Sequence, residues 1–219
     1  MSIKNLKNKS GREFFASIIG KSTIDKDGEE HKMIQDVTKY LLEEKRFGVI
    51  HGGYEGGTMS AVSDAANEVI SLKGFPEEAN IGVPQMQHDN LWPRVSKASF
   101  TEVAKDIQDR LRMVLAGDVI VVAPFGGDGT HLEFTLAFHE NVIKDTQNQE
   151  AVVEKVKPII FLCTKKGTNW KDLIDITINL LDNGKSSVKE YSWIHFVYSI
   201  KEFKELINKN FINSLLNKK

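Results

Sequence analysis

The stretch DVIVVAPFGGDGTHLEF, residues 118–134, decides the fold, because it joins an apolar strand to a helix through a glycine-rich turn. The unbroken apolar run at 118–124 is typical of a strand buried on both faces. Three glycines follow within residues 126–129, and a helix is predicted to begin at Thr130. Such a turn can hold an anion on its backbone N–H groups, or it can only reverse the chain.

The same order of apolar strand and amphipathic helix recurs along the chain. We predict further strands at residues 14–20, 47–51, 80–84, 158–163 and 193–199. We predict helices at residues 29–46, 58–71, 99–116, 130–144, 168–182 and from about 200 onward. This alternation predicts an α/β fold, a single Rossmann-like, doubly wound domain with a mostly parallel sheet and helices on both faces. We expect one domain over residues 1–219, with residues 1–12 flexible, a loop at 85–98, and either a loop or a helix extension at 145–157.

Composition narrows the class of protein. The 219 residues carry a formal net charge of −1, so no basic surface suggests nucleic-acid binding. A single cysteine, Cys163, excludes an internal disulfide and favours a cytoplasmic location. No apolar run approaches the roughly 20 residues that a membrane span needs. The six histidines lack the spacing of metal ligands, so we expect no metal.

A second glycine-rich turn, GGYEGG at 52–57, follows the predicted strand at 47–51. In parallel sheets ligands bind beyond the carboxyl ends of the strands, so the two turns line one crevice if their strands are neighbours. The tetrapeptide GKST (20–23) is a third turn near this crevice. It is not a P-loop, because Phe15 stands where the first glycine of that motif should be.

Neither turn has the G-x-G-x-x-G order of a dinucleotide fingerprint. In the later turn Leu132 occupies the place of the third glycine. A nicotinamide-dependent enzyme is therefore the least supported of the nucleotide-binding classes.

Two charged residues each allow two interpretations. Thr130 and Glu133 have the spacing of a capping box, in which both side chains satisfy backbone donors at a helix start. Alternatively, Glu133 lies one helical turn into the crevice and faces a ligand. Arg110, on the helix before the 118–124 strand, is either a solvated surface residue or a ligand contact.

These motifs together resemble the LOG (Lonely guy) family of nucleoside 5′-monophosphate phosphoribohydrolases, long labelled possible lysine decarboxylases. The family motif PGGxGTxxE is similar to GGDGTHLE at 126–133, although Phe125 replaces its proline. Arg110 stands 16 residues before the glycine pair, where the family has an arginine, and Leu111 replaces the lysine that often follows it. HGGYEGGTMSAVSDAANE (51–68) resembles the family's GG-x-x-G-x-M-x-A-V segment, and the resemblance covers about residues 14–200.

The resemblance implies hydrolysis of the N-glycosidic bond of a nucleoside 5′-monophosphate, AMP or an N6-modified AMP, to free base and ribose 5-phosphate. It assigns catalysis to Glu133, which would stabilise positive charge on the ribose, and to Arg110, which would hold the ligand or favour departure of the base. It places these residues around phosphate and ribose: Gly20, Ser22, Gly53, Gly57, Thr58, Met59, Gly126, Gly127, Gly129 and Thr130.

The resemblance also implies no cofactor and no metal. It suggests a homodimer whose contacts involve the helices at 99–116 and 130–144. The main alternative is a protein that binds a nucleotide without cleaving it.

Overall fold

The computed structural model describes residues 3–85, 98–124, 126–147, 156–164, 170–181 and 191–208. Phe125, most of the predicted loop at 85–98 and most of the polar segment at 145–157 lie outside these residues.

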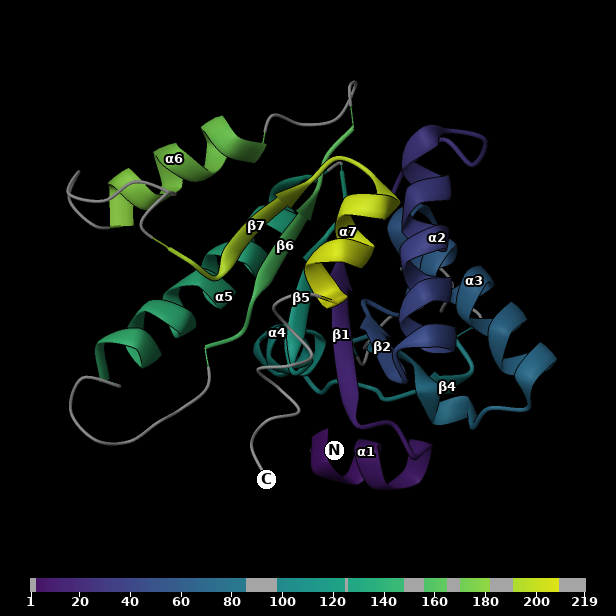
Figure 1. The fold of residues 1–219 in the computed structure, drawn as a ribbon. Helices are drawn as coiled ribbons and strands as arrows, with labels where there is room; N and C mark the ends of the chain where they lie inside the picture. The colour runs from purple at the N-terminus through teal and green to yellow at the C-terminus, as the bar shows by residue number, and fades with distance from the viewer. Residues whose placement is uncertain are drawn as a thin grey trace.

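A parallel sheet forms the centre of the protein (Figure 1). In the described part of the chain it has seven strands in the order β4-β3-β2-β1-β5-β6-β7. The strands are β1 (Phe14–Ile19), β2 (Phe47–His51), β3 (Asn80–Gly82), β4 (Phe100–Thr101), β5 (Val119–Val122), β6 (Ile159–Leu162) and β7 (Ile194–Val197). The predicted α/β, Rossmann-like fold is confirmed.

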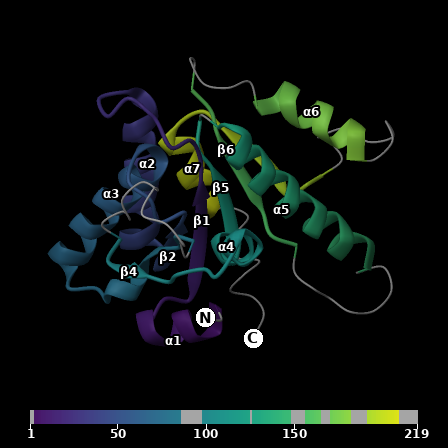
Figure 2. The same ribbon diagram turned by 180° about the vertical axis from the view of Figure 1, so that it is seen from behind.

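Helices cover both faces of the sheet. They are α1 (Ile3–Ser10), α2 (Glu29–Glu44), α3 (Gly57–Lys73), α4 (Ile107–Val114), α5 (Asp128–Gln147), α6 (Trp170–Leu181) and α7 (Ile200–Leu206), with a 3-10 turn η1 at Glu77–Ala79. One face packs against α2, α3 and α7, and the other against α4, α5 and α6. Figure 2 views the molecule from the side of α4 and α5.

The strands are apolar throughout because both of their faces are buried. In β1, Ala16 and Ile18 face the core under α2 and α3, whereas Phe15 and Ile19 face the core under α4 and α5. This continuous burial explains why unbroken apolar runs, rather than alternating ones, marked the strands in the sequence.

One prediction of local structure was wrong. The helix expected at 99–116 begins only at Ile107, because Asp106 caps it by accepting a hydrogen bond from the Asp109 amide. The residues before it include β4, whose Phe100 pairs with Ile81 of β3. Within residues 1–12, for which flexibility was predicted, Ile3–Ser10 form helix α1, and its Leu6 is buried against the sheet.

The order of the strands fixes where a ligand can bind. The chain adds β2, β3 and β4 on one side of β1 and then crosses to add β5 on the other side. β2 and β5 are therefore not neighbours, and their two glycine turns are separated by the end of β1. A crevice opens where the strand order reverses in this way, and ligands of doubly wound folds bind there.

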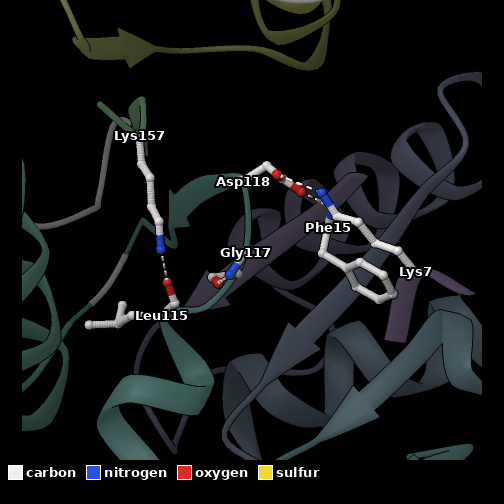
Figure 3. Close-up of polar contacts among 7 residues, drawn as sticks. Lys7, Phe15, Leu115, Gly117, Asp118 and Lys157 are labelled. Carbon is white, nitrogen blue, oxygen red and sulfur yellow. Dashed lines mark hydrogen bonds and ion pairs between the residues drawn. The ribbon is translucent and has the colours of Figure 1, made fainter. Parts of the chain in front are cut away.

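At the opposite edge of the sheet, Asp118 anchors β1 to α1 (Figure 3). Its carboxylate accepts a hydrogen bond of 2.8 Å from the backbone N–H of Phe15 and pairs with Lys7 at 2.8 Å. Nearby, Lys157 donates to the carbonyl of Leu115, and the Gly117 amide donates to Ser17. These bonds satisfy backbone groups at the amino ends of β1 and β5.

We expect Asp118→Ala to lower the free energy of unfolding by about 2 kcal/mol, because it leaves the buried Phe15 N–H without an acceptor. Lys7→Ala removes only the partly exposed ion pair and should cost less than about 1 kcal/mol. Urea unfolding of both variants measures the difference. Equal losses of unfolding free energy in the two variants would show that the hydrogen bond from Phe15 to Asp118 adds nothing beyond the ion pair.

Candidate functional site

A cavity of about 440 Å³ opens at the carboxyl end of β1. Its walls come from the segment after β1, the turn after β2, helix α4 and the first turns of α5. Eight of the residues selected from the sequence line it: Gly20, Ser22, Met59, Arg110, Gly127, Gly129, Thr130 and Glu133.

The amino end of α5 faces this cavity. The Gly127 carbonyl accepts the first helical hydrogen bond, from the His131 amide at 3.0 Å, so the N–H groups of residues 128–130 have no partner within the helix. The helix dipole adds a partial positive charge at the same end. This end of the cavity is therefore suited to an anion such as a phosphate.

The capping-box interpretation of Thr130 and Glu133 is wrong. Helix α5 begins at Asp128, so Thr130 lies inside the first turn and does not cap it. The sequence pattern predicted a later helix start because the turn before α5 is shorter than its three glycines suggest. The Glu133 side chain instead faces Arg110.

Gly127 and Gly129 are not required by the fold. A β-carbon at either position would meet no atom within 4 Å, and neither residue has a positive φ. Both line the cavity. The absence of their side chains leaves the amide groups of the turn open to a ligand.

Four other selected residues are not among those that line the cavity. Gly53 and Gly57 have φ values of 75° and 49°, and each is packed against neighbouring backbone. A side chain on Gly126 would strike the ring of Trp170, and Thr58 is fully buried against Gly20. The structure gives these residues packing roles in the walls behind the cavity.

Arg110 and Glu133 face one another inside the cavity. Arg110 Nη1 lies 3.7 Å from Glu133 Oε1, and their side chains are only 14% and 10% exposed. Arg110 Nη2 also donates to the carbonyl of Gly52 at 3.4 Å, and the guanidinium carbon lies 5.2 Å from the centre of the Tyr54 ring. Arg110 is therefore a held, partly buried cation, and the solvated-surface interpretation is wrong.

Burial changes the chemistry of Glu133. It raises the pKa of the carboxyl to about 7, and the positive charge of Arg110 opposes the rise. A carboxyl with such a pKa exchanges protons near neutral pH, as general acids and bases do. Perturbed carboxyl groups in a cleft are typical of functional sites.

Sequence reasoning missed several lining residues. They are Ile18, Ile19, Lys21, Gly52, Tyr54, Val114 and Asp128. Lys21 directly follows Gly20 in the turn GKST, and Tyr54 lies between the glycines of GGYEGG, so their positions in these turns were the available signal. Lys21 is exposed and brings a positive charge to the mouth, while Asp128 brings a negative charge to the amino end of α5.

Over the described ranges, no three His, Cys, Asp or Glu side chains group as metal ligands would. Within the same ranges, no helix has the length and apolar character needed to cross a membrane.

Fold and cavity together define a Rossmann-like protein with a cavity at the point where its strand order reverses. The chain matches no protein-family model and no curated protein. Solved structures do resemble it. The molybdenum cofactor carrier protein of Chlamydomonas reinhardtii is 19% identical, with a TM-score of 0.56 over 90% of this chain and 100% of its own.

Two further structures are similar to the same extent. The molybdenum cofactor binding protein of Rippkaea orientalis is 18% identical, with a TM-score of 0.57 over 94% of this chain and 98% of its own. The structural-genomics target TM1055 is 20% identical, with a TM-score of 0.59 over 89% of this chain and 98% of its own. At such identities the similarity establishes the fold.

The raised pKa of Glu133 predicts a dependence of stability on pH. Above the ordinary carboxyl pKa the unfolded chain releases this proton while the folded chain keeps it, so stability falls as pH rises toward about 7. Glu133→Gln removes the titration. From pH 5 to pH 8, we expect the free energy of unfolding of this variant to rise relative to that of the parent by on the order of 2 kcal/mol.

Urea unfolding at the two pH values measures this change. If the free energies of unfolding of Glu133→Gln and the parent differed by the same amount at pH 5 and at pH 8, the raised pKa would be contradicted.

Proposed function

We propose that the cavity binds a nucleoside 5′-monophosphate and that Glu133 and Arg110 hydrolyse its N-glycosidic bond. One observation carries the proposal. A buried carboxyl group that titrates near neutral pH faces a held arginine at 3.7 Å, and both lie in the cavity onto which the amino end of α5 opens. Arg110 and Glu133 both belong to the motifs that resemble the LOG family.

Cleavage of the N-glycosidic bond leaves positive charge on the ribose as the electron pair departs with the base. The Glu133 carboxylate stabilises that charge and takes a proton from the attacking water, whose oxygen forms the new bond to C1′. The proton passes to the departing base. Arg110, fixed by Gly52 and Glu133, favours the electron-rich base or holds the ligand.

The phosphate would lie against the amides of residues 128–130, which have no partner within α5, and Lys21, which also lines the cavity, would add a positive charge. Binding there positions the ribose at Glu133, one helical turn further along α5. Asp128 is exposed to solvent, which screens its repulsion of the phosphate.

A second candidate is a carrier that binds a phosphorylated ligand without cleaving it. Its support is that two of the similar structures are titled as a molybdenum cofactor carrier protein and a molybdenum cofactor binding protein. The amino end of α5 would suit the anionic group of such a phosphorylated ligand. A carrier has no need of a buried carboxyl group that titrates near neutral pH, so we favour the hydrolase.

We also propose that the protein is a homodimer. Apolar side chains are exposed on the two helices that line the cavity: Leu132 is 53% exposed and Ile143 42% on α5, and Ile107 is 48% exposed on α4. A second copy of the chain would bury them.

The hydrolase is tested by incubating the protein with AMP, with adenosine and with other nucleoside monophosphates, and measuring free base by chromatography. We expect release from a monophosphate and not from its nucleoside. Glu133→Gln should lower the rate by about 100-fold or more and stay folded. Arg110→Ala should also lower it.

Gly129→Ala is the control for the phosphate. Its β-carbon clashes with nothing in the protein and should leave stability unchanged or raise it by up to about 1 kcal/mol. It should nevertheless weaken AMP binding about tenfold by crowding the amides. Stabilisation by a monophosphate without base release would favour the carrier, and no effect of any nucleotide would overturn both candidates.

For the dimer, we expect light scattering to give twice the chain mass, and Leu132→Glu to give a monomer. Leu72→Glu is the matched control, because Leu72 is 72% exposed on α3, away from the proposed contact. A parent protein that is monomeric at micromolar concentration would contradict the proposal.

A further inference from the structure

The peptide group between Gly52 and Gly53 is held at both ends. Its carbonyl accepts a hydrogen bond from Arg110 Nη2 at 3.4 Å, and its N–H donates to His51 Nδ1 at 3.3 Å. In a planar trans peptide these two groups point in opposite directions. The observed orientation satisfies both Arg110 and His51, whereas the reverse orientation would turn an N–H toward Arg110, which has no acceptor for it.

His51 is itself fixed. It ends β2, is fully buried, and its Nε2 lies 3.0 Å from Ser63 Oγ on α3. Because Gly53 can only donate, Nδ1 must accept, and the ring proton must lie on Nε2. Burial lowers the pKa of His51 to about 4, so the ring is neutral near pH 7 and keeps this tautomer.

The surrounding backbone leaves the turn little freedom. Gly53 has a φ of 75°, and a β-carbon there would lie 2.6 Å from the backbone nitrogens of Val83 and Pro84. The Val83 amide also donates to the His51 carbonyl at 2.9 Å. His51 thus supplies the side-chain acceptor for a turn that β3 and its following residues enclose.

We propose that His51 is a positioning residue: through its Nδ1 it sets the orientation of the Gly52–Gly53 peptide, and through that peptide it places Arg110 against Glu133. This role rests on the proposed function of the site for its catalytic effect, but its effect on Glu133 is independent of catalysis. If the peptide turned over, an N–H would face the guanidinium. Arg110 would lose its acceptor, and its Nε already has no hydrogen-bond partner among the described residues.

Two substitutions separate this role from simple packing. His51→Asn places an amide oxygen near the position of Nδ1 and keeps an acceptor for Gly53. In His51→Gln the longer side chain places its amide toward Ser63 and leaves the Gly53 N–H without an acceptor. Thr38→Val is a control for stability alone, since Thr38 is buried in α2 and its hydroxyl donates to the carbonyl of Ile34.

The first readout is the titration of Glu133 in the ligand-free protein, followed by carboxyl ¹³C NMR. We expect His51→Gln to raise the pKa of Glu133, because Arg110 no longer opposes the effect of burial, and His51→Asn and Thr38→Val to leave it unchanged. The second readout is kcat/KM for base release from AMP, which we expect to fall about tenfold in His51→Gln and less than about threefold in His51→Asn.

The tautomer is measured in the parent protein by ¹⁵N NMR of the histidine rings, which needs no variant to fold. A proton on Nδ1 would overturn the proposal, as would equal titration of Glu133 in the parent and His51→Gln. If the parent releases no base, the hydrolase proposal fails, while the titration of Glu133 still decides the role of His51.

Discussion

The ion pair between Arg110 and Glu133 is the interaction on which the site depends. Each charge is removed from most of its water, and each is the partner that makes burial of the other tolerable. The pair joins α4 to α5 across the end of β1, at the place where the strand order reverses. The glycine turns, the Gly52 carbonyl and the amino end of α5 are arranged around it.

Backbone groups and side chains have different proposed roles in the cavity. In the proposed site, backbone groups would hold the anion, because the amides of residues 128–130 have no partner within α5. Side chains would carry the reaction, and burial raises the pKa of Glu133 to about 7. This division explains why Gly127 and Gly129 have open space around them, whereas Gly53 and Gly57 are packed tightly. Gly127 and Gly129 therefore leave access to the cavity, whereas Gly53 and Gly57 are needed for the path of the chain.

The fold and the centre of the site could be predicted from the sequence, because strands buried on both faces leave unbroken apolar runs such as 118–124. Arg110 and Glu133 could be selected because spaced motifs carry them. The start of α4 was misjudged, since residues 99–106 have helical composition and only pairing with β3 makes part of them a strand. Lys21, Tyr54 and the acceptor role of His51 depend on contacts between distant turns, which periodicity does not encode.

The proposed phosphate site at the amino end of α5, beside Glu133, can be tested directly. The measurement is a titration of ¹⁵N-labelled protein with ribose 5-phosphate and, separately, with ribose, followed through backbone amide shifts. We expect ribose 5-phosphate to move the amides of Asp128, Gly129 and Thr130 in a saturable way and ribose to leave them unchanged. Saturable binding of ribose 5-phosphate that leaves these three amides unchanged, or equal shifts with ribose, would contradict it.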